Sequence, residues 1–266
     1  MLRLYLHETD SLTPQSVLYQ PTRSASERLT KLLGATYFDF PKDETTIQML
    51  IEMASDENDI VLDFFAGSGT TGHAVFAQNA LDKLKRRFIL VQLPEPIATG
   101  NFSNIAEICR ERLRCAAVKI KSEKAQSLFD LDTGFRVLKI DTSNMRDVYY
   151  TPDAVAQGDL LAHVDNIRAD RTPEDLLFQV LVDWGLDLAL PISQTTITGK
   201  TVFFVDGNAL AACFDTGVTD ELVKEIAKRK PLRAVFRDAS YGSDSVKINV
   251  DQIFKLLSPE TEVRSI

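Results

Sequence analysis

A glycine-rich turn directly follows a short apolar run, and no other part of the sequence has such clear chemical character. The run is Ile-Val-Leu-Asp-Phe-Phe at 60–65, and three glycines follow within 67–72. Glycines after a buried strand let the backbone approach a ligand, because no Cβ blocks it. Asp63 could then meet a cationic group of that ligand, and Phe65 could form an apolar wall beside it. In the alternative interpretation, Asp63 only caps the turn and Phe65 belongs to the core.

The glycine spacing also admits a second ligand class. Gly67, Gly69 and Gly72 match the pattern G-x-G-x-x-G, which alone is a weak indication of a dinucleotide site. The pattern is not a P-loop, because no Lys-Ser or Lys-Thr ends it. A dinucleotide site needs an acid for the adenosine ribose at the end of the next strand, where Gln92 stands. Asp63 would also be a poor neighbour for a pyrophosphate, so a dinucleotide-dependent oxidoreductase is kept only as an alternative.

The elements around the turn read as a βαβ unit. Apolar runs predict two buried parallel strands, and helical spacing of apolar residues predicts the helix between them. The predicted strands cover 60–65 and 88–93, and the predicted helices cover 22–33, 43–54, from the turn to about Asn79, and 103–121. We therefore expect the glycine turn at the carboxyl end of the first strand, where α/β sheets bind their ligands.

The long helix at 103–121 carries a run of cations. Its apolar face includes Ile108 and Leu113, and the basic residues fall largely on the other faces: Arg110, Arg112, Arg114, Lys119 and Lys121. This arrangement indicates a solvated helix surface, with contact to nucleic acid as the alternative.

A second group of elements follows residue 127. Alternation predicts a strand over Phe135–Ile140, and Thr172-Pro173-Glu174-Asp175 opens a helix with an N-cap and a proline at its first position. Further strands at Thr201–Val205 and Ala234–Phe236 flank a helix over Asp220–Lys228. The sequence therefore predicts an α/β protein of two parts, 1–126 and a smaller α/β domain at 127–266.

Composition narrows the class of protein. The net charge of −8 argues against a chain that grips a phosphate backbone by itself, since duplex binding relies on clustered Lys and Arg. Cys109, Cys115 and Cys213 are sparse and odd in number, which indicates a reduced, cytoplasmic protein. The three histidines are too far apart for a local metal site, so no metal is expected. No apolar run reaches the roughly 20 residues of a membrane helix, so no membrane contact is expected.

Several segments together resemble the modification subunits of type III restriction-modification systems, which are β-class DNA amino-methyltransferases. The string at 61–72 resembles their motif I, close to D-x-F-x-G-x-G-T-T, and Phe38-Asp39-Phe40-Pro41-Lys42 resembles their motif X. Further similar segments lie at 86–95, 134–144, 165–190 and 212–215. The resemblance spans most of 20–257 and is that of the C-terminal part of such a subunit.

The resemblance implies a partial Rossmann-like methyltransferase core that binds S-adenosylmethionine. It assigns cofactor contacts to Asp63, Phe65, Gly67 and Gly69, and closure of the methionyl side to Phe40, Pro41 and Lys42. Neighbouring turn residues complete the predicted set: Phe64, Ala66, Ser68 and Thr70. Many relatives carry a Glu for the ribose hydroxyls where this chain has Gln92, a neutral amide that can bind a diol only without charge assistance. Glu95 could substitute, or it is merely a loop acid.

The catalytic loop of the family, (D/N/S)-P-P-(Y/F/W), is missing, since the sequence contains no Pro-Pro dipeptide. In the β class that loop precedes motifs X and I, so we expect a fragment, split subunit or cloned domain that has no catalytic residue and is inactive alone. The resemblance implies N6-adenine methylation of duplex DNA in the complete enzyme, a homodimer, and a restriction (helicase-nuclease) subunit as partner. A third interpretation is a non-catalytic assembly module that acts through residues 160–257.

Overall fold

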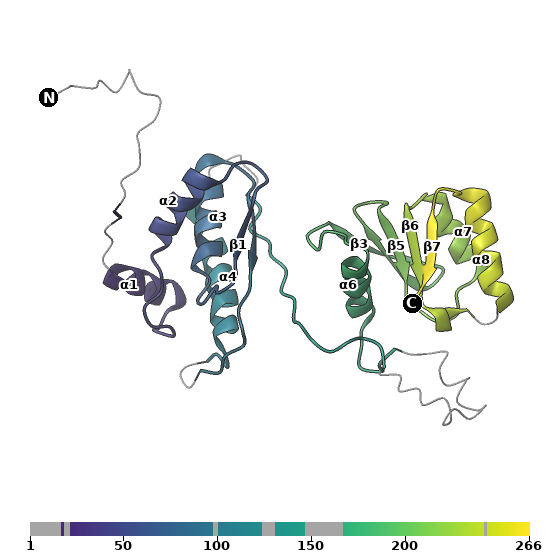
Figure 1. The fold of residues 1–266 in the computed structure, drawn as a ribbon, viewed down its shortest axis with the longest axis horizontal. Coiled ribbons are helices and arrows are strands. Elements are labelled where there is room, and N and C mark those ends of the chain that lie inside the picture. Colours follow the sequence, from purple (N-terminus) through teal and green to yellow (C-terminus); the bar gives the residue numbers. More distant parts are fainter. Residues whose placement is uncertain (1–16, 19–21, 98–100, 124–130, 147–166, 242–243) are drawn as a thin grey trace, which may run out of the picture. The chain divides into compact units, whose positions relative to one another are not determined.

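The computed structural model describes residues 17–18, 22–97, 101–123, 131–146, 167–241 and 244–266. The chain divides into two compact units, Met1–Phe135 and Arg136–Ile266 (Figure 1). Each unit contains both helices and strands, which confirms the mixed α/β class predicted from the sequence.

The first unit is built on a βαβ motif. Strand β1 (Ile60–Asp63) pairs in parallel with β2 (Arg87–Leu90), and Ile60 lies opposite Arg87 in the register. Helix α3 (Thr70–Asp82) connects the two strands. The predicted strand–helix–strand order is therefore confirmed.

Helices cover one face of this two-stranded sheet (Figure 1). They are α2 (Glu44–Ala54), α3 and α4 (Ile105–Glu123), and α1 (Thr22–Leu33) packs against α4. Val61 and Phe88 point from the strands into this layer, where they pack with Ile51, Ala74 and Val75. The alternating strand residues therefore form the core of the unit on this side only.

The opposite face of the sheet is apolar and open. Ile60, Leu62, Ile89 and Val91 are between 39% and 50% exposed, and none belongs to a core cluster of the described part of the unit. Parallel sheets are normally covered on both faces, which is why their strands are apolar throughout. The apolar runs thus predict burial on a side that the described residues leave uncovered.

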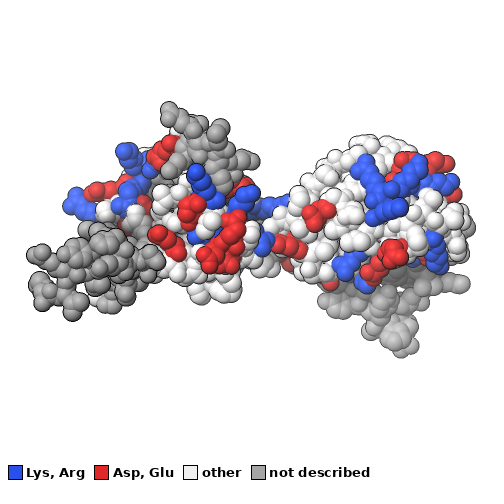
Figure 2. Space-filling view, turned by 90° about the horizontal axis from the view of Figure 1, so that it is seen from above, with Lys and Arg blue, Asp and Glu red and all other residues white. Residues whose placement is uncertain are grey.

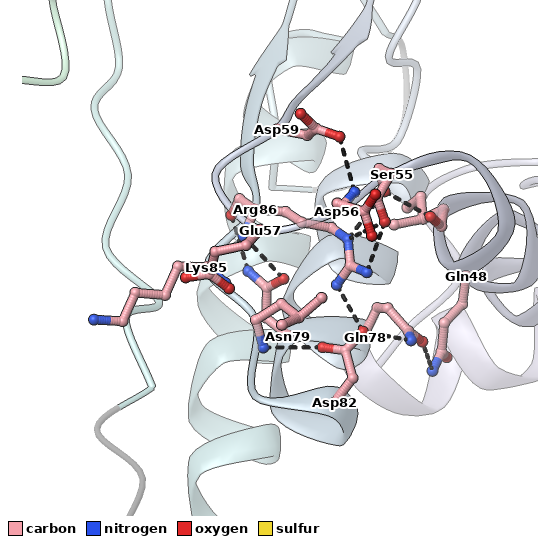
Figure 3. A network of polar contacts seen from close by, with 12 residues as sticks. Gln48, Ser55, Asp56, Glu57, Asp59, Gln78, Asn79, Asp82, Lys85 and Arg86 are labelled. Carbon is pink, nitrogen blue, oxygen red and sulfur yellow. Dashed lines mark hydrogen bonds and ion pairs between the residues drawn. The ribbon is translucent and has the colours of Figure 1, made fainter.

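A buried arginine fixes the end of the sheet remote from the glycine turn (Figure 3). Arg86, just before β2, donates through its guanidinium to the backbone oxygen and hydroxyl of Ser55 and to the carboxylate of Asp82. The amide side chain of Asn79 also donates to the carbonyl of Arg86 and accepts its N–H. These bonds join the end of α2, the end of α3 and the start of β2.

The second unit is a five-stranded mixed sheet in the order β3-β4-β5-β6-β7. The strands are β3 (Ile192–Ile197), β4 (Lys200–Val205), β5 (Leu210–Cys213), β6 (Arg233–Phe236) and β7 (Glu262–Ser265). The first three are antiparallel, and β5, β6 and β7 are parallel. Helix α6 (Pro173–Asp183) covers one face, and α7 (Asp220–Lys228) and α8 (Asp244–Leu257) cover the other, with a short 3-10 helix η3 at Asp238–Ser240 (Figure 1).

Most predicted elements of this unit are confirmed, and one is wrong. Thr172 and Asp175 form the expected capping box at the start of α6. The predicted strand at Phe135–Ile140 is absent, and Ile140 is fully exposed. Instead, the guanidinium of Arg136 donates to the backbone oxygen of Leu190 at 2.7 Å. Alternation alone does not make a strand where no neighbouring strand pairs with it.

Both strands of the first unit end earlier than predicted, at Asp63 and Leu90. The chain turns after Asp63, because the Asp63 carboxylate accepts the N–H of Phe65 at 3.0 Å. Beyond Leu90, the backbone of Val91 bonds to Asp63 and to Ala66 of the turn, so the second segment follows the turn and no longer a strand.

Acidic and basic side chains are interspersed on each unit in the face shown in Figure 2. In the part of the chain that is described, no group of three His, Cys, Asp or Glu side chains could hold a metal ion, and His7 and His163 lie outside that part. None of the described helices combines the length and the hydropathy that crossing a membrane requires.

Candidate cofactor-binding site

Asp63 holds the start of the glycine turn. One carboxylate oxygen accepts the N–H of Phe65, and the other accepts the hydroxyl of Thr71 at 2.6 Å. Asp63 therefore caps the turn, as the alternative interpretation states. That interpretation fails for Phe65, whose ring is 90% exposed and does not belong to the core. The carboxylate thus sits at the carboxyl end of β1 beside an exposed aromatic ring.

Gly69 is required by both its backbone angle and its neighbour. Its φ is +80°, in the left-handed region, and it forms the N-cap of α3. A Cβ at this position would lie 2.8 Å from the sulfur of Cys109 in α4, closer than real contacts allow. Helix α4 therefore supports the turn from behind.

Gly72 has a different role, in helix packing. A Cβ there would lie 2.7 Å from Leu113 and 2.9 Å from Leu90. Because Gly72 has no Cβ, α3 can pack close to both α4 and β2. The third glycine has the same role in Rossmann-type turns. The glycine spacing thus reflects close packing as well as ligand access.

Gln92, predicted at the end of the second strand, follows β2 and lies against the turn. Its side-chain oxygen accepts the N–H of Gly67 at 2.7 Å, and its amide nitrogen donates to the carbonyl of Leu93. Glu95 has an exposed side chain, and its backbone oxygen accepts the N–H of Ile105 at the start of α4. Gln92 therefore contacts the turn through its side chain, whereas the described contact of Glu95 is through its backbone.

The segment containing Phe40, Pro41 and Lys42 lies against the turn. The hydroxyl of Thr70 donates to the carbonyl of Lys42 at 3.5 Å, and a Cβ on Gly67 would lie 3.6 Å from the ring of Phe38. Pro41 is buried, whereas Phe40 is 83% exposed with a φ of +51°. A positive φ is uncommon for a bulky residue, and such strain concentrates at functional sites. The two segments singled out by sequence are thus in contact.

Arg112 is the main site residue that the sequence interpretation missed. It is 1% exposed, so the interpretation of the α4 cations as a solvated surface is wrong for this residue. Its Nη1 donates to the hydroxyls of Ser68 at 3.0 Å and Thr70 at 2.7 Å. The signal was present in the spacing, because Arg112 lies four residues after Ile108 and four before Ala116, on the buried face of α4.

Two further groups complete the surroundings of this guanidinium. Its Nε donates to Nδ1 of His73 at 3.4 Å, and its Nη2 lies 3.7 Å from the carboxylate of Glu44. Burial lowers the pKa of Arg112 to about 10, against the opposing effect of Glu44, so it stays charged at neutral pH. Burial and the nearby Arg112 charge lower the pKa of His73 to about 4, so its ring is neutral and can accept a hydrogen bond.

Glu44 belongs to a second cluster at the start of α2. Arg28 of α1 bonds both Glu44 and Asp43, and Asp43 caps α2 by accepting the N–H of Thr46 at 2.9 Å. Desolvation raises the pKa of Asp43, but hydrogen bonds from Thr45, Thr46 and Arg28 outweigh it and lower the pKa to about 2. The segment before α2 is therefore held by ion pairs on one side and by the turn on the other.

The assembled site contains groups for binding and no described group arranged for nucleophilic chemistry. Cys109 is buried behind the turn, and burial raises the pKa of its thiol to about 11, so it is unreactive. A capped carboxylate, exposed aromatic rings and a glycine turn at the end of a strand can bind a nucleoside-bearing ligand.

Comparison with known proteins shows which family the chain is similar to. Residues 8–98 match a family of DNA methylases. The modification subunit of the type III restriction-modification enzyme EcoPI, from Escherichia phage P1, is 32% identical over 258 residues, which is 90% of this chain and 38% of the relative. The chain is related to type III modification subunits.

Two more modification subunits align with this chain. That of EcoP15I from Escherichia coli is 27% identical over 86% of this chain and 35% of the relative. That of StyLTI from Salmonella typhimurium is 32% identical over 52% of this chain and 24% of the relative. The chain thus spans between 24% and 38% of the length of these curated relatives.

Proposed function

We propose that this chain is the S-adenosylmethionine-binding part of a type III modification methyltransferase, which methylates the N6 of adenine in duplex DNA. The observation that carries the proposal is that the 38–42 segment lies against the glycine turn: the hydroxyl of Thr70 donates to the carbonyl of Lys42, and the ring of Phe38 lies 3.6 Å from the place a Cβ of Gly67 would take. These are the two segments that resemble the cofactor motifs of the family, and they are far apart in sequence.

The residues present fit the cofactor. Asp63 can accept a hydrogen bond from the methionyl ammonium, because each carboxylate oxygen has a second lone pair beyond its bond within the turn. The exposed rings of Phe40 and Phe65 offer apolar surface to the adenine and to the methionyl chain of the cofactor. Gln92 and Glu95 stand at the end of β2, where ribose hydroxyls bind in related folds. When bound, the cofactor supplies an electrophilic methyl group on its sulfonium.

The acceptor base needs a separate loop, and this sequence contains no Pro-Pro dipeptide. We propose that the loop comes from additional polypeptide, either more of the same protein or a partner chain. The open apolar face of β1 and β2 favours this view, since a parallel sheet gains stability when its second face is covered. The chain alone is then expected to bind the cofactor without transferring its methyl group.

Isothermal titration calorimetry tests the proposal directly. We expect S-adenosylhomocysteine to bind the purified chain and NAD not to bind. The dinucleotide alternative predicts the reverse, and binding of neither ligand would refute both. In a transfer assay with radiolabelled S-adenosylmethionine and duplex DNA, activity should require the polypeptide that carries the missing loop.

For the second unit we propose a role in assembly, as a homodimer contact or as a site for the restriction subunit. The supporting observation is an open hollow between α7 and α8, in which Leu256 is 82% exposed. Its lining is apolar on the α8 side and charged on the α7 side: Ile253, Leu256 and Leu257, and Glu221, Lys224, Glu225 and Lys228. Light scattering of the chain, alone and with the restriction subunit of the same system, tests this role. A chain that stays monomeric and does not bind that subunit would contradict the assembly role.

A further inference from the structure

From α4, Arg112 reaches two parts of the first unit that are distant in the sequence, the turn with the start of α3 and the start of α2. Its guanidinium reaches Ser68 and Thr70 of the turn, His73 of α3 and Glu44 at the start of α2. Side-chain exposure is 1% for Arg112 and 12% for Glu44, so water competes little for these bonds. A buried charge is retained only where it is paired and hydrogen-bonded, as it is here.

The geometry of these bonds defines the shape of the turn. Ser68 and Thr70 flank Gly69, and a single nitrogen, Nη1, donates to both hydroxyls. One donor atom thus fixes the separation of the two side chains on either side of Gly69. Thr70 in turn donates to the carbonyl of Lys42, so the same contact set extends to the opposite wall of the site.

We propose that Arg112 is a positioning residue for the cofactor, which holds the turn and the 38–44 segment in their binding arrangement before the ligand arrives. This inference rests on the proposed function, because the ligand is S-adenosylmethionine. A lysine cannot replace Arg112, since one ammonium on a flexible stem lacks the planar fork that spans the hydroxyls and the carboxylate.

Arg86 provides a matched control in the same unit. Like Arg112, it is buried, pairs with a carboxylate and donates to a hydroxyl, here that of Ser55. Unlike Arg112, it also donates to a backbone oxygen, and it lies at the end of β2 remote from the turn (Figure 3). A purely structural role for buried arginines would make the two positions respond alike. A positioning role makes only Arg112 affect the turn.

Two measurements on Arg112→Lys, Arg86→Lys and Glu44→Gln separate these roles. Hydrogen exchange of the ligand-free chain reports the protection of residues 63–73, and calorimetry reports binding of S-adenosylhomocysteine. We expect Arg112→Lys to speed exchange in the turn and to weaken binding about tenfold or more, the cost of losing charge-assisted hydrogen bonds. Arg86→Lys should keep both properties even where its loss of Tm is as large. Glu44→Gln should change both in the direction of Arg112→Lys, by a smaller factor.

The proposal is overturned if Arg112→Lys and Arg86→Lys change turn exchange and affinity equally, or if neither changes them. If Arg112→Lys does not fold, Glu44→Gln against Arg86→Lys decides by the same comparison. If the wild-type chain binds no S-adenosylhomocysteine, the proposed function is wrong. The exchange data would still show whether Arg112 holds the turn, because they are measured without ligand.

Discussion

The backbone N–H of Gly67 donates to the side-chain oxygen of Gln92 at 2.7 Å. This bond ties the glycine turn after β1 to the segment after β2, so Gln92 supports the turn whatever it offers a ligand. Gln92→Ala should therefore loosen the turn and weaken binding of S-adenosylhomocysteine about tenfold. Gln92→Glu keeps the acceptor and adds charge assistance for ribose hydroxyls, so its affinity should equal or exceed that of the wild type.

Calorimetry on both variants measures these effects, with Glu95→Gln as a companion. If Glu95 is a loop acid, the companion variant binds as the wild type does. If Gln92→Ala binds as tightly as the wild type, the bond to Gly67 contributes nothing to the site.

Gly69 and Gly34 offer a matched pair of glycines. Both have left-handed backbone angles, φ +80° and +82°, but only Gly69 faces a neighbour within contact distance, the sulfur of Cys109. Gly34→Ala should cost about 1–2 kcal/mol, the strain of a left-handed alanine. Gly69→Ala should cost about 1–3 kcal/mol more, because the added methyl overpacks against α4.

Urea unfolding followed by circular dichroism gives both free energies of unfolding. Equal losses for the two variants would mean that α4 does not support the turn as closely as the contact indicates.

His73 makes the stability of the first unit depend on pH. Its pKa is lowered to about 4, so between pH 4 and about 6.5 the unfolded chain binds a proton that the folded chain does not. The contribution of neutral His73 to the free energy of unfolding is therefore fully present above pH 6.5 and is lost as the pH falls toward 4. The slope is about 1.4 kcal/mol per pH unit at most. His73→Gln, which keeps an acceptor for Arg112, should remove this slope.

Thermal unfolding at several pH values measures the slope. Trp184, the only tryptophan of the chain, lies in the second unit, so its fluorescence provides an internal control that His73→Gln should not alter. An unchanged pH slope in the variant would contradict the neutral state of this histidine.

The open face of the first sheet should bind apolar probes. Leu62 and Ile89 lie opposite each other in the register and are about half exposed. Replacing both with threonine keeps strand propensity and should reduce the fluorescence of an anilinonaphthalene sulfonate dye, while affinity for S-adenosylhomocysteine stays unchanged. Leu81→Thr, at a single exposed leucine of α3, should leave the dye signal as it is. An equal signal in all three proteins would mean that the face is not an exposed apolar surface.

Local signals predicted much of the fold. The apolar runs at 60–65 and 88–93, the helical spacing at 43–54 and the cap at Thr172 predicted the right elements, because strand burial and helix formation depend on residues close together in the sequence. Strand ends were less predictable. They depend on Asp63 turning the chain, which is a contact between a side chain and the backbone two residues later.

The edge strands of the second unit, β3 and β7, were not predicted. They carry polar and charged residues, and they pair only because a neighbouring strand offers its free edge. The strand expected at Phe135–Ile140 fails for the converse reason, since apolar alternation there finds no pairing edge.

For the candidate site, residue types predicted the glycine turn after β1 but not the side chains that support the turn. Asp63, Gly67 and Gly69 stand in one string, whereas Arg112 reaches the turn, and Glu44 reaches Arg112, from helices whose packing sets their place. On a helix rich in cations, the sequence alone makes a buried arginine look like part of the charged surface. The four-residue spacing from Ile108 was the one local sign against that reading.

The central claim is that the glycine turn after β1 and the 38–42 segment form one S-adenosylmethionine site. Titration of the chain with S-adenosylhomocysteine, followed by a two-dimensional amide NMR spectrum, tests it most directly. The claim predicts saturable shifts of the amides of Gly67, Gly69 and Lys42 with a common affinity, and no shifts with NAD. Saturating ligand that leaves these three amides unmoved would contradict it.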